Sequence, residues 1–525
     1  MFFAKTAPRR LAPLLATLLL PAALLGAAAQ PAFSQSAGKS EVVFASPILR
    51  QHFDPSLMVA TTDYLINDVM FDGLLNLTVD GKKPALATSW TVSPDGKQID
   101  FELRKNVVFH NGDPFTAEDV KFTFEKILRP DNNHSYRNGF VTALERVEVV
   151  GPHQARFILK NPWPAFFTTA RFGLQSIVPK DYYEKVGAKG FQEKPVGTGP
   201  FKLVEAKAGE WNRFEAHDKY WGEVAHFKTL VQRLVAEPFT RYAMLEKGEA
   251  DIVSGLTGPL LERISTNKTI RLFSSKYAST AGIYFNPAKF TEAADKRVRL
   301  AVGHAINLEQ ITKKILNGTC EPASTILTPA TFGYEPNKYK VIPYDPAKAK
   351  ALLKEAGVPL GREVDFVLST ESLAPVPNAP QVLEAVAGDL EAVGLKIKRI
   401  PHDTQAWFGM MRGGKQPGIY WGGASMSDDA GELLGGWYVS NAVWTAGQVK
   451  VPDYDRIYKE QLQTASGQER EKLLAQFAAL EDENKMAVPF IWCDASFAAS
   501  PRIATWKPAT GTPYHLNFNT IQLSK

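Results

Sequence analysis

One short stretch toward the C-terminus, Ile419–Asp429 (IYWGGASMSDD), combines residue types that can do chemistry. An aromatic pair runs into two glycines, and the stretch ends on two adjacent carboxylates, Asp428 and Asp429. Carboxylates beside aromatic rings could act as a general acid and base, or could hold a cationic ligand against an apolar wall. The simplest structural interpretation of the two aspartates is a solvated turn or a helix start, because Asp is a favoured N-cap residue.

Sequence motifs for catalysis, metal binding and nucleotide binding are missing. There is no G-x-S-x-G nucleophile elbow, no His-x-x-x-His pair and no EF-hand loop. The glycines of Pro195–Phe201 (PVGTGPF) resemble a phosphate loop, but Pro200 and an apolar strand pattern follow where a P-loop needs Lys-Ser/Thr. The nine histidines are scattered, and we expect structural roles for His110 and His304. The sequence therefore predicts a protein that is not an enzyme and has no metal site and no cofactor.

Tryptophans in irregular, glycine-rich or proline-rich surroundings could form the walls of a ligand pocket. Trp421 is the first candidate, and Trp407 and Trp437 follow, together with Trp163 and Trp444. The alternative is that each ring packs inside its own part of the protein. Both interpretations stay open from the sequence alone.

The N-terminus has the pattern of a secretory signal peptide. Three basic residues precede the apolar run Leu11–Ala29, and small residues offer a cleavage site after Ala29 or Ser34. We therefore expect residues 1–34 to be removed from a periplasmic protein, and no cysteine follows the apolar run for lipid attachment. A membrane anchor is the alternative, but two prolines and an Ala/Gly-rich end disfavour a stable span.

The formal net charge is only +5, without a basic cluster, so we expect no nucleic-acid partner.

The two cysteines are Cys320 and Cys493. An oxidising compartment would permit a disulfide between them. Cys320 lies in a loop-like stretch (NGTCEPAS), whereas Cys493 ends an apolar run (VPFIWC) that predicts a buried strand. We expect two independent thiols, and two cysteines leave no room for a cysteine-based zinc site.

The elements that must position these residues alternate between strands and helices. Residues 98–104 alternate apolar and polar, which is typical of a half-buried strand, and Thr116 with Asp119 makes a near capping box at a helix start. Residues 295–318 read as one long amphipathic helix closed by Asn317-Gly318. A strand–helix–strand unit within residues 363–400 implies a parallel pair with a right-handed crossover. The fold class is therefore α/β.

Several motifs occur together in one order along the chain. The densest run is Leu86–Leu128, with the turn Pro94-Asp95-Gly96, the alternating strand, then FHNG and FTAEDV. It is followed by PVGTGPF, YWG, EKGEADI, GIYFNP and RVRLAVGHAINLEQI. With these motifs the chain resembles the periplasmic solute-binding proteins of ABC importers in the peptide/opine/nickel cluster, called solute-binding protein family 5. The resemblance spans essentially everything after the signal peptide.

The resemblance implies a periplasmic-binding-protein type II fold, with two lobes, an extra inserted domain and a central interlobe cleft. Lobe I would combine residues 40–75, 195–275 and 490–525, the inserted domain would be 76–194, and lobe II would be 276–489. Ligand would lie between lobes that close by hinge motion. The implied partner is an ABC permease with cytoplasmic ATPases, and we expect a monomer.

The resemblance also predicts where a ligand would bind. In family members that carry peptides, an Asp about three residues after the Trp of this loop pairs with the N-terminal ammonium of the ligand, since a buried ammonium needs such a partner. Counted from Trp421, that position is Ala424. A peptide or peptide-like cargo is implied. The missing acid leaves open a non-peptide solute, such as an opine, a sugar conjugate, an aromatic compound or a metal chelate, and a ligand sensor or chaperone of the same fold.

The candidate ligand contacts fall into three groups. Main-chain groups and the Ser425 hydroxyl would make polar contacts, arginines would hold an anionic group, and the others would form walls or the approach from lobe I. The set is His52, Phe53, Arg137, Trp407, Arg412, Trp421, Gly422, Gly423, Ala424, Ser425 and Trp437.

Overall fold

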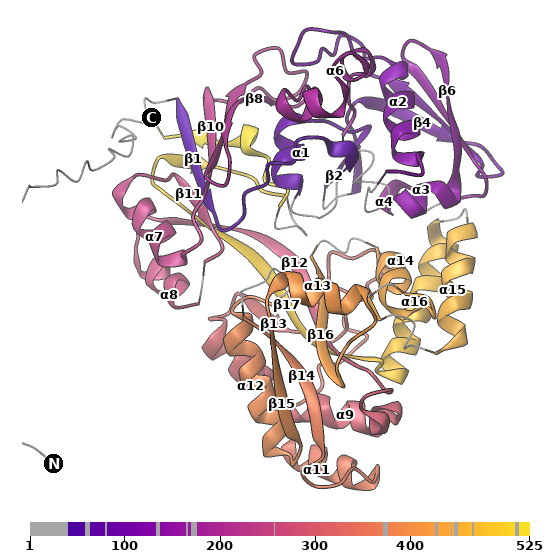
Figure 1. Cartoon of the computed structure of the whole chain (residues 1–525), viewed down its shortest axis with the longest axis vertical. Coiled ribbons are helices and arrows are strands. Elements are labelled where there is room, and N and C mark those ends of the chain that lie inside the picture. Colours follow the sequence, from indigo (N-terminus) through magenta and orange to yellow (C-terminus); the bar gives the residue numbers. More distant parts are fainter. Residues whose placement is uncertain are drawn as a thin grey trace, which may run out of the picture. The chain divides into compact units, whose positions relative to one another are not determined.

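The computed structural model describes residues 40–57, 63–78, 81–132, 137–163, 166–169, 176–256, 258–370, 376–425, 429–442, 444–445, 450–464, 467–509 and 514–524. The predicted signal peptide lies outside these residues. The α/β class is confirmed by a large mixed sheet flanked by helices (Figure 1). Its strands, in order, are β15 (Lys396–His402), β14 (Glu363–Ser369), β16 (Ile419–Ser425), β12 (Arg271–Phe285), β17 (Ala487–Ala499), β11 (Ile252–Ser254), β1 (Glu41–Ser46), β10 (Thr229–Leu234), β9 (Trp211–Ala216) and β8 (Phe201–Lys207), with β13 (Cys320–Pro322) also paired to β17.

The long strands β12 and β17 connect two separate apolar cores. They pair antiparallel from Arg271 opposite Ala499 to Tyr284 opposite Ala487. At one end, Phe497 and Ala499 of β17 join the buried cluster that contains residues of β1 and β8 to β10. At the other end, both strands join a second cluster that draws only on residues between 281 and 493. The division into lobes at the predicted boundaries stays a prediction.

A smaller antiparallel sheet lies within residues 87–159. Its order is β4 (Ala87–Val92), β5 (Gln98–Leu103), β7 (Gln154–Leu159) and β6 (Leu144–Gly151). The predicted alternation in β5 is confirmed, because Ile99, Phe101 and Leu103 are buried while Glu102 between them is exposed. The capping box is also confirmed: the Asp119 carboxylate accepts a hydrogen bond from the Thr116 backbone N–H at 2.8 Å, where α2 (Ala117–Leu128) begins.

The prediction of one long helix over residues 295–318 is wrong. The structure has α9 (Lys296–Ala305), then α10 (Leu308–Gln310), and then the π-helix η4 (Ile311–Ile315). Ile306 is extended, and the Asn307 side chain accepts the backbone N–H of Gln310 at 3.0 Å. An asparagine inside the apolar pattern therefore starts a new helix.

The strand–helix–strand prediction is confirmed. β14 and β15 pair in parallel, and α12 (Ala379–Ala392) connects them. The remaining elements are β2 (Leu75–Thr78), β3 (Gly81–Pro84), β18 (Ile503–Thr505), β19 (Gln522–Leu523), α1 (Tyr64–Met70), α3 (Arg137–Ala143), α4 (Phe166–Thr169), α6 (Lys180–Glu193), α7 (Pro238–Lys247), α8 (Gly258–Thr266), α11 (Pro346–Glu355), α13 (Thr404–Arg412), α14 (Ala430–Leu433), α15 (Pro452–Gln463), α16 (Gly467–Asn484), the π-helix η5 (Leu434–Tyr438), and the short 3₁₀ turns η1 (Pro55–Leu57), η3 (Thr291–Ala294) and η6 (Phe518–Thr520).

The glycines of PVGTGPF serve backbone packing. A Cβ atom on Gly197 would lie 2.0 Å from the carbonyl oxygen of Met70, so only glycine fits. His110 holds this loop, because its Nδ1 accepts from the Gly197 N–H at 3.2 Å and its Nε2 lies 3.0 Å from the Gly199 carbonyl. Burial lowers the pKa of His110 to about 3, so the ring is neutral at neutral pH. The structural role predicted for His110 is confirmed, and Nδ1 of His304 likewise lies 2.8 Å from a backbone carbonyl.

The prediction of two independent thiols is wrong, because Cys320 and Cys493 form a disulfide. Cys493 lies in the predicted buried strand, which is β17. Cys320 lies directly opposite it in β13, so antiparallel pairing brings the two sulfurs together across 173 residues of sequence.

Among the described residues, no helix is both long and apolar enough to span a membrane.

Candidate ligand-binding site

Strand β16 carries the first seven residues of the stretch Ile419–Asp429. It pairs with β12, so that Trp421 lies opposite Ile283, Gly422 opposite Gly282 and Ala424 opposite Thr280. Side chains alternate along a strand, so Gly422 and Ala424 share one face while Trp421 points to the other. Tyr420 and Trp421 are only 1% exposed, whereas Gly423 and Ala424 are partly exposed. Solvent therefore reaches β16 at its C-terminal end.

Four of the five candidate tryptophans come together in one array of stacked rings, whereas Trp163 packs against Phe140 and Phe166 in the first core. Trp421 stacks on Trp407 of α13 with the ring centroids 4.9 Å apart. Trp437 of η5 stacks on Tyr284 of β12 at 4.6 Å. Trp444 joins the two pairs, at 6.3 Å from Trp407 and 6.0 Å from Trp437. Trp407, Trp421 and Trp437 are all more than 90% buried, so in this conformation they pack as part of the core.

The two glycines that follow Trp421 are explained in part by this array. A Cβ atom on Gly422 would lie 2.3 Å from the Trp437 ring, so the ring packs directly on the strand backbone. Any other residue at this position would displace Trp437. Gly422 thus allows the Trp437 ring to pack directly on β16. The next two residues, Gly423 and Ala424, are partly exposed.

Some buried hydrogen-bond donors on the described residues of β16 and of the elements packed against it have no partner. Within the described part of the chain, the buried indole N–H groups of Trp407 and Trp421 have no hydrogen-bond partner. The same holds for the hydroxyl of Thr280, which lies opposite Ala424. Buried polar groups are usually paired, and the exceptions often mark functional positions. Indole N–H groups are donors only, so these positions suit an acceptor oxygen better than an ammonium.

Asp429 is buried, which corrects the expectation of a solvated turn. Its side chain is 0% exposed and accepts from the Gly431 N–H at 2.8 Å, so the alternative of a helix start is confirmed at α14. Arg470 of α16 donates to both of its carboxylate oxygens, at 2.7 and 2.6 Å. The guanidinium also donates to Gln461 at 2.9 Å. The charge of Asp429 is thus neutralised inside the protein. Asp428 lies outside the described residues.

The other candidate residues lie on separate elements. His52 is exposed, and Phe53 is buried with its N–H donating to Gln192 Oε1 at 2.8 Å. Arg137 donates to the backbone carbonyls of Arg129 and Leu128, at 2.6 and 3.2 Å. The guanidinium of Arg137 therefore already stabilises the segment after α2. Arg412 ends α13 and Ser425 ends β16, but their side chains are not among those described.

Sequence reasoning missed Thr280, Tyr284 and Arg470. Tyr284 lies in GIYFNP, and the alternation of that strand could have indicated that it faces Tyr420, on which it stacks at 5.7 Å. Arg470 carries no local signal, because its partner is 41 residues away. Thr280 becomes relevant only through the register of β12 against β16.

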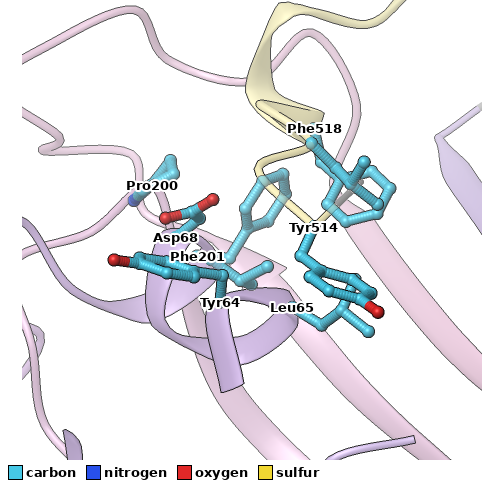
Figure 2. A pocket seen from close by; sticks show the side chains of 9 residues that line it. Tyr64, Leu65, Asp68, Pro200, Phe201, Tyr514 and Phe518 are labelled. Atoms are coloured by element: carbon cyan, nitrogen blue, oxygen red, sulfur yellow. The ribbon is translucent and has the colours of Figure 1, made fainter. Parts of the chain in front are cut away.

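Two cavities elsewhere are weaker candidates. One lies between α1, β8 and the C-terminal segment, where Tyr64, Phe201 and Tyr514 line a gap with no room for a water molecule (Figure 2). The other, of about 380 Å³, lies beside α2 and α6. Its buried Lys126 already donates to Asp54 at 3.2 Å.

Among the described residues, no group of three or more His, Cys, Asp or Glu side chains could hold a metal ion.

The chain is similar to known proteins over most of its length. Residues 82–444 match the family described as "Bacterial extracellular solute-binding proteins, family 5 Middle". The chain is 28% identical to the heme-binding protein A of Haemophilus influenzae, over 93% of this chain and 94% of that protein. It is also 28% identical to the dipeptide-binding protein of Escherichia coli, over 73% of this chain and 75% of that protein.

A solved structure has the same fold. It is the ABC transporter-associated periplasmic binding protein of Helicobacter pylori in complex with the peptide STSA. The TM-score is 0.79 and the sequence identity 25%, over 93% of this chain and 99% of that one. The expected type II periplasmic-binding-protein fold is confirmed by this similarity.

Proposed function

Because the chain belongs to the bacterial extracellular solute-binding proteins of family 5, we propose that it captures a small organic solute and delivers it to the permease of an ABC importer. The predicted family is confirmed by the match over residues 82–444. In this proposal the protein binds its cargo without chemical change, and the relatives named above are binding proteins. Export by the predicted signal peptide would place residues 35–525 in the periplasm as a monomer.

Capture would take place between two lobes with the predicted boundaries. The two apolar cores support this division, since β12 and β17 are the strands that contribute to both. Ligand contacts to both lobes would favour a closed form, which the permease would recognise. The inserted domain would correspond to the separate sheet of β4 to β7.

The proposed contact region in lobe II is the open end of β16. Gly423 and Ala424 are partly exposed there, with the stacked tryptophans behind them. Main-chain groups of Gly423 and Ala424 would make polar contacts, and the donors of Thr280 and Trp421 lie on the two faces of the strand. His52 and Phe53 remain candidates on lobe I, and Arg412 and Ser425 remain candidates on lobe II.

The pair Asp429–Arg470 carries the proposal about the cargo. A ligand ammonium at β16 would need a carboxylate, because an unpaired buried charge is costly. Ala424 offers none, and Asp429 is already paired with Arg470 at 2.6 Å. We therefore expect a neutral or anionic group of the cargo at this position, in a peptide with a blocked N-terminus or in a non-peptide solute. Relatives named for dipeptides, heme and nickel fit a family that varies its cargo.

Thermal-shift screening of the mature protein tests this proposal. The screen would compare matched pairs of di- and tripeptides with free and N-acetylated N-termini, together with opines, sugar conjugates and aromatic acids. We expect stabilisation by ligands without an ammonium, and no stabilisation by free peptides. In the Ala424→Asp variant, a carboxylate opposite Thr280 should reverse the preference toward free N-termini.

Two results would contradict the proposal. Stabilisation of the wild-type protein by free peptides alone would show that the ammonium is held elsewhere. Turnover of any compound in the screen would contradict capture without chemistry. The Ala424→Ser variant is the matched control, because it adds a polar group without a charge and should leave the preference unchanged.

A further inference from the structure

The ladder between β12 and β17 is interrupted where the chain passes from one apolar core to the other. Ser275 lies opposite Ala495 and Ser279 lies opposite Cys493. Between these pairs, β12 has the three residues Lys276, Tyr277 and Ala278, while β17 has only Asp494. This is a bulge, which bends a strand and breaks its regular pairing.

The backbone of the bulge is in an unusual conformation. Tyr277 has a φ of 52°, in the left-handed region that bulky residues avoid. Such strain persists only where the surroundings hold the residue in place, and it occurs often at switch regions. The Tyr277 ring packs edge-on against Trp492, with the centroids 6.3 Å apart.

The carboxylate of Asp494 holds the bulge. It accepts a hydrogen bond from the backbone N–H of Tyr277 at 3.0 Å. Tyr277 lies in the bulge and has no partner in the ladder between the two strands. The Asp494 carboxylate also accepts the hydroxyl of Ser274 at 3.4 Å and forms an ion pair with Lys276. One side chain of β17 thus contacts the backbone or side chains of three residues of β12, all at or beside the interruption.

On the side of the second core, β17 is fixed up to the backbone N–H of Asp494. The disulfide ties Cys493 to Cys320 of β13, and three residue pairs join these strands. The backbone N–H of Asp494 donates to the Thr319 carbonyl at 2.9 Å. Bending between the two cores is therefore expected at the bulge of β12 and at Asp494, the residue of β17 that lies opposite it.

We propose that Lys276–Ala278 is the hinge of this protein and that Asp494 is its latch, a positioning residue that sets the balance between open and closed forms. The inference rests on the proposed function, because it assumes two lobes that move. Asp494 stabilises one backbone conformation of the bulge. A variant without the carboxylate would release that conformation and shift the balance.

The test measures distances between the two cores in the full mature protein without ligand. The native cysteines are both in the disulfide, so spin labels can be placed on Glu205→Cys in β8 and Lys350→Cys in α11, which are exposed. Double electron–electron resonance then gives the distance distribution. For Asp494→Ala we expect the ratio of open to closed populations to change about ten-fold, the effect of losing one charged hydrogen bond.

Two further variants separate a latch from a merely structural residue. Asp494→Asn keeps an acceptor for the Tyr277 N–H and should shift the distribution less than Asp494→Ala. Asp482→Asn is the matched control, because Asp482 also pairs with a lysine, Lys485, but within the second core. It should leave the distribution unchanged.

The outcomes distinguish the latch from the two-lobed function. Suppose that the wild type has two populations. An identical distance distribution in Asp494→Ala would then overturn the latch, whether or not the variant melts at a lower temperature. A single narrow distribution in the wild type and every variant, unchanged by any solute that stabilises the protein, would instead overturn the two-lobed movement and with it the proposed function.

Discussion

The pairing of Asp429 with Arg470 limits the charge that the proposed site at β16 can offer to a ligand. The sequence places two aspartates close after Trp421, and either could have replaced the acid that is missing at Ala424. The structure uses Asp429 internally, where it caps α14 and binds Arg470. The register of the strand leaves Ala424 at the open end. Strand β16 itself (Ile419–Ser425) contains no carboxylate, and the Asp429 carboxylate that follows is already paired.

The buried pair makes a stability prediction. Arg470→Met would leave the Asp429 carboxylate buried without its partner, at side-chain exposures of 3% for Arg470 and 0% for Asp429. We expect a loss of about 3–5 kcal/mol in the free energy of unfolding. The double variant Asp429→Asn/Arg470→Met should recover most of that loss, because no unpaired charge remains. Urea unfolding at neutral pH measures both.

A single variant within about 0.5 kcal/mol of the wild type would contradict the buried pair. Arg456→Met is the control, since Arg456 makes ion pairs on the surface of α15 with Asp453 and Glu460. Exposed pairs contribute little, so this control should be nearly neutral.

At the scale of elements, local patterns could be predicted and long-range partners could not. The alternation of Ile99 and Phe101 and the cap at Thr116 depend on residues a few positions apart, and the structure has both. The helix over 295–318 failed because Asn307 interrupts an otherwise continuous apolar period. The cysteines failed because pairing depends on the register of β13 against β17, which no local pattern encodes.

The disulfide gives a prediction for these two strands. Replacing both cysteines by Ser removes a cross-link over 173 residues of sequence, and we expect the free energy of unfolding to fall by about 2–5 kcal/mol. Thermal or urea unfolding of the oxidised wild type and the double variant measures the change. Thiol titration of the denatured protein provides the control: no thiol should react before reduction. Two reactive thiols without reductant would contradict the cross-link.

On the scale of the whole molecule, the fold class and the family were predicted from motifs spread along the chain. The cores joined by β12 and β17 fit that prediction, because these two strands contribute residues to both cores, and their pairing is interrupted between Ser275 and Ser279 and again between Ala281 and Gly282. The arrangement of the candidate site was predicted only in part. Trp407, Trp421 and Trp437 do come together, but they are buried in a stack that depends on η5 and α13, elements whose packing no short motif specifies.

The mass of the small molecule that is released when the purified protein is denatured tests the central claim most directly. Native mass spectrometry of the mature protein before and after denaturation provides it, and an amine-labelling reagent classifies the released compound. We expect a non-covalently bound organic solute that does not react with the reagent, because β16 has Ala424 where an ammonium would need an acid. A released di- or tripeptide with a reactive N-terminus would contradict the account.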